Sequence, residues 1–116
     1  MTDDPYPLCQ GPNPSPTPVS FAVSFAVSAG AVDCHAHIFG PQNVYPYSPT
    51  RGYTPPDADL ETFLNLPKIL GGIERAVLTQ PSVYGTDNAC MLDAIDQMGG
   101  RFRAIAAVNA RPACQA

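Results

Sequence analysis

The sequence predicts an α/β fold built around a parallel sheet, and three observations lead to this prediction. Short apolar segments alternate with segments of helical periodicity, in the order strand, long loop, helix, strand, helix, strand. Such alternation favours parallel strands joined by right-handed crossovers. The strand segments are apolar without polar alternation, as in a sheet covered on both faces or in a closed barrel. The 116 residues suffice for one small domain.

The first predicted strand leads into a long loop. Residues 31–38 (AVDCHAHI) form this strand, and residues 42–56 form a loop dense in Pro and Tyr. Loops of this length inside compact domains are usually functional or disordered.

The first helix is predicted to begin at an aspartate and to end near a proline. Asp57 or Asp59 is placed to act as its N-cap. Apolar side chains recur at i, i+3 and i+4 on one face: Leu60, Phe63 and Leu64. Because Pro67 would break a helix interior, either the helix ends at about Leu66 or a second short turn starts at Pro67.

Two further strands flank a second helix. Residues 73–79 (IERAVLT) predict the second strand, and residues 103–108 (RAIAAV) predict a third strand that is buried on both faces. Thr86 or Asp87 caps the helix between them, and Gly99-Gly100 closes it. The apolar residues of this helix recur at three-residue steps: Ala89, Leu92, Ile95 and Met98.

The ends of the chain carry no clear pattern of regular structure. Eleven of the 14 prolines fall within the first 56 residues. We expect residues 1–28 to form a Pro-rich leader and an extended arm that are partly disordered. Residues 29–109 hold the structured part, and residues 110–116 form an unstructured tail.

Composition argues against several classes of protein. The net charge is −4 and the six Lys and Arg residues form no dense cluster, so no nucleic-acid partner is expected. The apolar run 19–29 follows no positive charge and is too short for a membrane span, so neither secretion nor a membrane partner is expected. The four cysteines form no C-x-x-C pair, which favours reduced thiols and a cytoplasmic protein. Cys34 and Cys90 lie in a predicted strand and helix, where we expect both to be buried.

The strongest candidate site lies at the C-terminal end of the first strand, in the run Asp33-Cys34-His35-Ala36-His37. Since side chains alternate along a strand, His35 and His37 point the same way and Cys34 points away. Two imidazoles at this spacing can converge on one zinc ion or one substrate oxygen. Asp33 shares their parity and is placed either to fix a histidine tautomer or to act as a structural hydrogen-bond partner. The alternative is a pair of incidental histidines satisfied by backbone carbonyls.

Three runs resemble one enzyme family in the right order: AVDCHAHIFGP, YPYSPTRGYTPPDA and GIERAVLTQPSVYGTDNACMLDAI. Residues 29–108 resemble the amidohydrolase superfamily, and within it the amidohydrolase-related group of 2-pyrone-4,6-dicarboxylate lactonases and sulfomuconolactone hydrolases. The resemblance implies a (β/α)8 TIM barrel, of which this chain holds the first three strands and two helices, with the active site at the C-terminal mouth. A full barrel takes about 250 residues, so we interpret the chain as a truncated product or fragment.

The resemblance also implies roles for particular residues. His35 and His37 match the catalytic pair that ends the first barrel strand. They are also the ligands if a divalent metal ion such as zinc is bound, although part of the group is metal-independent. The family also needs a histidine from a middle strand and an aspartate from the last strand, which lie beyond residue 116. Pro67 and Gly71-Gly72 depart from the unbroken first helix of the family.

Three residues near the same mouth are candidate substrate contacts. Arg51 offers a planar fork for a carboxylate, and the resemblance places Tyr53 of the same loop at the substrate pocket. Ser82 follows the second strand, where the resemblance puts a polar pocket residue. The alternative for Arg51 and Tyr53 is a Pro/Tyr loop that packs on itself. The alternative for Ser82 is a role in the turn that leads to the next helix.

The function implied is hydrolysis of a lactone or amide of a small carboxylated ring compound. The histidines would polarise the carbonyl, directly or through a bound divalent ion, and a carboxylate from the rest of the barrel would activate water. The alternatives are a decarboxylase on the same scaffold and a non-catalytic fragment. We expect the isolated 116-residue chain to be inactive and poorly folded, and the oligomeric state stays open.

Overall fold

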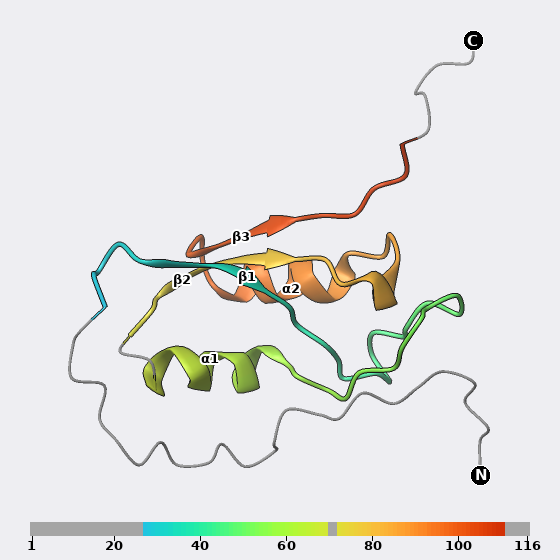
Figure 1. The fold of residues 1–116 in the computed structure, drawn as a ribbon, viewed down its shortest axis with the longest axis horizontal. Helices are drawn as coiled ribbons and strands as arrows, with labels where there is room; N and C mark the ends of the chain where they lie inside the picture. Colours follow the sequence, from blue (N-terminus) through green and yellow to red (C-terminus); the bar gives the residue numbers. More distant parts are fainter. Residues whose placement is uncertain (1–26, 70–71, 111–116) are drawn as a thin grey trace.

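The computed structural model describes residues 27–69 and 72–110. Three parallel strands form one sheet in the order β1-β2-β3, and helices α1 and α2 connect them (Figure 1). Along the chain the elements are β1 (Val32–Ala36), α1 (Leu60–Ile69), β2 (Arg75–Thr79), the 3-10 helix η1 (Ser82–Tyr84), α2 (Ala89–Gln97) and β3 (Phe102–Ile105). The predicted α/β class with a parallel sheet is confirmed. The expected leader and tail lie outside the described residues, apart from positions 27, 28 and 110.

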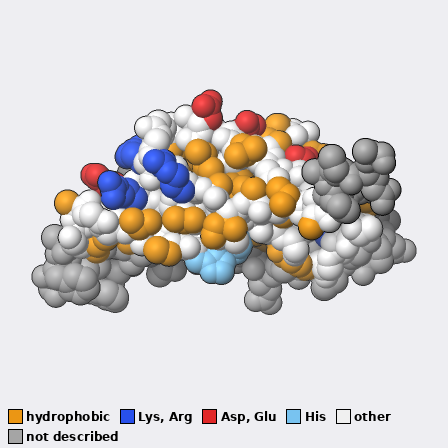
Figure 2. Space-filling model, turned by 90° about the horizontal axis from the view of Figure 1, so that it is seen from above, with side chains coloured by type: hydrophobic (Ala, Val, Ile, Leu, Met, Phe, Trp, Pro, Cys, Tyr) orange, Lys and Arg blue, Asp and Glu red, His pale blue; other side chains and the backbone are white. Residues whose placement is uncertain are grey.

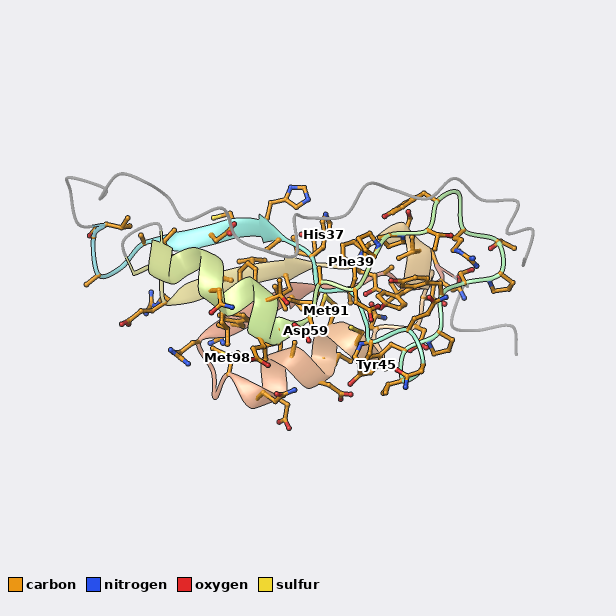
Figure 3. All side chains as sticks on the ribbon, turned by 90° about the horizontal axis from the view of Figure 1, so that it is seen from below. His37, Phe39, Tyr45, Asp59, Met91 and Met98 are labelled. Atoms are coloured by element: carbon orange, nitrogen blue, oxygen red, sulfur yellow. The ribbon has the colours of Figure 1, made fainter. Side chains whose placement is uncertain are left out.

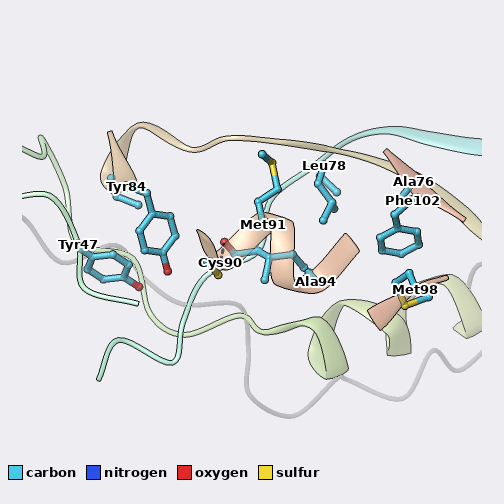
Figure 4. Close-up of a cluster of buried hydrophobic side chains, with 12 residues drawn as sticks. Tyr47, Ala76, Leu78, Tyr84, Cys90, Met91, Ala94, Met98 and Phe102 are labelled. Atoms are coloured by element: carbon cyan, nitrogen blue, oxygen red, sulfur yellow. Dashed lines mark hydrogen bonds between the residues drawn. The ribbon is translucent and has the colours of Figure 1, made fainter. Parts of the chain in front are cut away.

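One face of the sheet is buried against the helices. Leu78 of β2 is fully buried, and Phe102 of β3 is 2% exposed. They pack in one cluster with Met91, Ala94 and Met98 from the second helix and the turn after it (Figure 4). This apolar layer holds the strands in register, because burial of such side chains contributes about 1.5–3 kcal/mol each.

The other face of the sheet is open in the described part of the chain. Arg103 is exposed, Ile105 is 58% exposed and Val108 is 78% exposed. The expectation that the third strand is buried on both faces is therefore wrong for the described structure. The reason is that both helices lie on the same side of the sheet, so only the face with Phe102 is covered (Figure 3).

Helix α1 begins as predicted and ends later than predicted. The Asp59 carboxylate accepts a hydrogen bond from the backbone N–H of Thr62 at 2.9 Å, which makes Asp59 the cap. The same hydrogen bond holds the pKa of the Asp59 carboxyl below its usual value. The helix runs without a break through Pro67 to Ile69, so both the predicted end at about Leu66 and the alternative of a separate turn starting at Pro67 are wrong. Only two residues follow Pro67 in the helix, and its missing N–H removes a single hydrogen bond near the end.

Helix α2 is capped close to the predicted position. The Asp87 carboxylate accepts a hydrogen bond from the backbone N–H of Ala89 at 3.2 Å, although Asn88 is the last residue before the helix. The turn after the helix uses Gly99 and Gly100, whose φ angles are +58° and +92°. No helix within residues 27–69 and 72–110 has the length and apolarity that crossing a membrane requires.

The buried face of α2 differs from the predicted set. Leu92 is 52% exposed and Ala89 is exposed, whereas Cys90, Met91 and Ala94 are buried. Steps of three residues drift around a helix of 3.6 residues per turn, so the predicted positions do not stay on one face.

The long loop after β1 is ordered and packs against η1. Phe39 and Ala58 exchange two backbone hydrogen bonds of 2.9 and 2.8 Å, which close the loop at its base. The Tyr47 hydroxyl donates to the Pro55 carbonyl at 3.0 Å, and burial raises the pKa of Tyr47 to about 12. The rings of Tyr47 and Tyr84 lie 5.2 Å apart, so the tyrosines of this loop contribute to the core.

Candidate functional site

A β-bulge changes the direction of side chains in β1. Asp33 is paired with Ala76, and Ala36 is paired with Leu78, so three steps along β1 match two steps along β2. One extra residue in a strand breaks the simple alternation of faces. Cys34 lies within this irregular stretch and is exposed, which corrects the expectation that it is buried, while Cys90 is buried as predicted. His35 also lies in this stretch between Asp33 and Ala36, so simple parity does not relate Asp33 to the two histidines.

The two histidines lie next to each other on the open side of the sheet. Their ring centroids are 5.1 Å apart and the ring planes meet at 76°. Figure 2 shows their side chains (pale blue) side by side at the edge of the molecule. In Figure 3, His37 lies on the side of the sheet away from Met91 and Met98. His35 is exposed and His37 is half-buried, so both imidazoles are within reach of a ligand.

A backbone carbonyl fixes the orientation of His37. Its Nδ1 lies 2.8 Å from the carbonyl oxygen of Thr79, at the end of β2. Because a carbonyl oxygen only accepts hydrogen bonds, Nδ1 carries the proton and donates it. The Nε2 atom of neutral His37 therefore holds a lone pair, which can bind a cation or accept a proton. Protonated His37 can instead donate from Nε2 to an oxygen.

Of the two roles that the sequence allowed for Asp33, the structure shows the structural hydrogen-bond partner and not the tautomer-fixing acceptor. Its carboxylate accepts a hydrogen bond from the backbone N–H of His35 at 3.1 Å. It therefore steadies the backbone of the bulge. Thr79 takes the tautomer-fixing role through its backbone, so no side-chain pattern in the sequence could reveal it.

Gln80 also belongs to this region, although the sequence pattern assigned it no role of its own. Its backbone N–H donates to the Ile105 carbonyl at 3.0 Å. The Thr79–Gln80 peptide group is thus bound on both sides, to His37 through its C=O and to β3 through its N–H. Hydrogen bonds in such a chain polarise one another and strengthen the bond to His37. A polar residue directly after an apolar strand was the available signal.

The three candidate substrate residues lie in two segments. Arg51 and Tyr53 belong to the loop between β1 and α1, and Ser82 belongs to the turn after β2. Ser82 is exposed at the start of η1, two residues after Gln80. Tyr53 is half-buried and packs against the core cluster. In the described part of the chain, no hydrogen bond joins Ser82, Tyr53 or Arg51 to either imidazole.

Arg51 is engaged within its own loop. Its Nε donates to the Thr54 hydroxyl at 3.0 Å, and its guanidinium donates to the Ser48 carbonyl at 3.2 Å. The guanidinium also lies 5.9 Å from the centre of the Tyr47 ring. These contacts favour the alternative in which this loop packs on itself, since a substrate carboxylate would compete with them.

The donor set for a metal ion is incomplete in the described residues. A catalytic zinc site takes three protein ligands, and His35 and His37 provide two. Within residues 27–69 and 72–110, no group of three or more His, Cys, Asp and Glu side chains is arranged to hold a metal. The described residues alone therefore do not make a zinc site.

Fold and site together define an α/β protein with paired imidazoles at the C-terminal end of its first parallel strand. A family model described as Amidohydrolase matches residues 32–114. The chain belongs to this amidohydrolase family.

Relatives of known name support this assignment. The chain is 46% identical over 99 residues to a 4-sulfomuconolactone hydrolase of Rhizobium radiobacter, covering 85% of this chain and 31% of that protein. It is 44% identical over 85 residues to a 2-pyrone-4,6-dicarboxylate hydrolase of Comamonas testosteroni, covering 73% of this chain and 28% of that protein. The chain thus spans about three tenths of the length of these relatives.

A solved structure agrees with both. The crystal structure of a probable 2-pyrone-4,6-dicarboxylic acid hydrolase of Acinetobacter baumannii, with citric acid bound, superposes with a TM-score of 0.61. The sequences are 35% identical, and the match covers 67% of this chain and 28% of that chain.

Proposed function

We propose that residues 29–109 form the first part of a (β/α)8 barrel that hydrolyses a lactone of a small carboxylated ring compound. Two relatives are named as hydrolases of such compounds, and a similar protein was solved with the tricarboxylate citric acid. The observation that carries the proposal is the histidine pair, with rings 5.1 Å apart and His37 oriented by Thr79. Active sites of barrel enzymes lie at this C-terminal end of the strands.

His35 and His37 are the residues that we place at the reacting carbonyl. Attack of water on a lactone carbonyl develops negative charge on its oxygen, and hydrogen bonds or positive charge aimed there lower the barrier. His37 with both ring nitrogens protonated donates from Nε2 to that oxygen while Nδ1 stays bound to Thr79. In this proposal Ser82 contacts the carboxylated ring, and Tyr53 and Arg51 are further substrate contacts. The carboxylate that activates water comes from outside the described residues.

The proposed activity is tested in a barrel chimera. In this chimera, the 99 residues of this chain that align with the Rhizobium radiobacter 4-sulfomuconolactone hydrolase replace the corresponding part of that enzyme. We expect turnover of 4-sulfomuconolactone or 2-pyrone-4,6-dicarboxylate. The loss of lactone absorbance measures this turnover. A chimera that folds, as judged by circular dichroism, yet hydrolyses neither lactone would contradict the proposal.

Chelation tests whether the imidazoles act on substrate directly. Because the proposal has His37 donate from Nε2 directly to the carbonyl oxygen, we expect dialysis of the chimera against a chelator to leave kcat within about twofold. Loss of turnover that added zinc restores would instead place a divalent ion between Nε2 and the substrate. Metal content is measured in the same samples before and after dialysis.

We also propose a cytoplasmic location. Cys34 carries an exposed free thiol and Cys90 a buried one. Free thiols of this kind are typical of a reducing compartment.

A further inference from the structure

The side chain of Gln80 closes the turn that follows β2. Its Nε2 donates to the Asp87 carbonyl at 2.8 Å and to the Gly85 carbonyl at 3.2 Å. The turn is also held by its own backbone, since the Gly85 N–H donates to the Ser82 carbonyl at 3.0 Å. One amide therefore attaches the segment that begins at Ser82 to the end of β2.

The same residue is part of the peptide group that orients His37. The Thr79 carbonyl accepts from His37, and the Gln80 N–H of that peptide group donates to Ile105. Gln80 thus connects the hydrogen-bond acceptor of one proposed catalytic group with the turn that carries Ser82. A displacement of the turn changes the distance between Ser82 and His37, which lie on different loops.

Stability alone does not explain a glutamine at this position. Its Oε1 atom is buried and has no hydrogen-bond partner among the described residues. The assignment of oxygen and nitrogen is fixed by chemistry, because only the NH2 group can face two carbonyl oxygens. A buried polar atom without a partner destabilises the folded state, and such exceptions need an explanation.

We propose that Gln80 is a positioning residue, which sets Ser82 at the correct distance from His37 for binding the carboxylated substrate. This inference rests on the proposed function, in which Ser82 contacts substrate. Gln80 does not touch the substrate, and its amide acts through the turn from Ser82 to Asp87.

The test uses the barrel chimera and the variant Gln80→Met, which keeps the length of the side chain and removes the amide. We expect KM to rise about tenfold while kcat changes less than threefold, because a binding contact is weakened. The thermal midpoint should change little, because removal of the unpartnered Oε1 offsets the loss of the two hydrogen bonds to the Gly85 and Asp87 carbonyls. The matched control is Gln97→Met, which removes an exposed amide that donates to the Asp93 carbonyl on α2 and should leave KM unchanged.

A double-mutant cycle with Ser82→Ala shows whether the effect passes through Ser82. If it does, Gln80→Met has no further effect on KM once Ser82 is replaced. Additive effects on KM would overturn the proposal, as would a lowered thermal midpoint with KM unchanged.

If Gln80→Met does not fold, Gln80→Glu takes its place and should raise KM at least as much, because its carboxylate faces two carbonyl oxygens. Failure of both variants to fold would make Gln80 a purely structural residue, whereas an inactive parent chimera would count against the proposed function instead.

Discussion

Replacing His37 with alanine in the barrel chimera should lower kcat by about 10²–10³-fold, the largest effect expected of any single substitution here. The magnitude is that of removing one group that stabilises developing charge in the transition state. Nε2 of His37 is the atom aimed away from Thr79, and alanine removes it entirely. Steady-state kinetics with the lactone measures the loss, and circular dichroism checks that the variant is folded.

The control for this prediction separates catalysis from structure. His37→Asn retains an amide N–H near the position of Nδ1, so it can keep the hydrogen bond to the Thr79 carbonyl. It has no atom at the position of Nε2. We expect His37→Asn to be as inactive as His37→Ala but more stable. If asparagine restored turnover, the histidine would be the incidental, backbone-satisfied residue that the sequence also allowed.

Replacing Gly40 with alanine should destabilise the fold by about 2–3 kcal/mol, combining a left-handed backbone penalty with overpacking. Gly40 has a φ of +79°, where any Cβ is strained. A Cβ built there would also lie 2.7 Å from Cγ and 3.2 Å from Cβ of Asp57. Its N–H donates to the Tyr84 hydroxyl at 2.7 Å, so a shift of Gly40 also disturbs the contact between the long loop and η1.

Urea unfolding of the chimera measures this effect against a matched control. Gly52 lies in the same loop, has no positive φ and has open space at its Cβ position. Gly52→Ala should therefore change the free energy of unfolding by no more than about 0.5 kcal/mol. In an Asp57→Ala background, Gly40→Ala should cost about 1–2 kcal/mol, since the backbone penalty stays and much of the steric conflict is gone. Equal effects of Gly40→Ala and Gly52→Ala would show that this loop is not held as the structure describes.

The predicted fold followed from patterns that are local in sequence. Alternating apolar and helical segments identified the three strands and two helices, and Asp59 and Gly99-Gly100 were recognisable as helix ends. These signals are reliable because caps and turn glycines act within a few residues. The end predicted for α1 was wrong because the local rule for Pro67 takes no account of how the helix packs on the sheet.

The sequence by itself determined the α/β class, the family and the identity of the histidine pair. Only the tertiary structure decided how the pair is held. The register of β1 shifts between Asp33 and Ala36, Cys34 in this stretch is exposed, and a backbone carbonyl of β2 accepts the hydrogen bond from His37. Strand register and backbone acceptors depend on pairing between segments more than forty residues apart, and a backbone carbonyl looks the same at every position of a sequence.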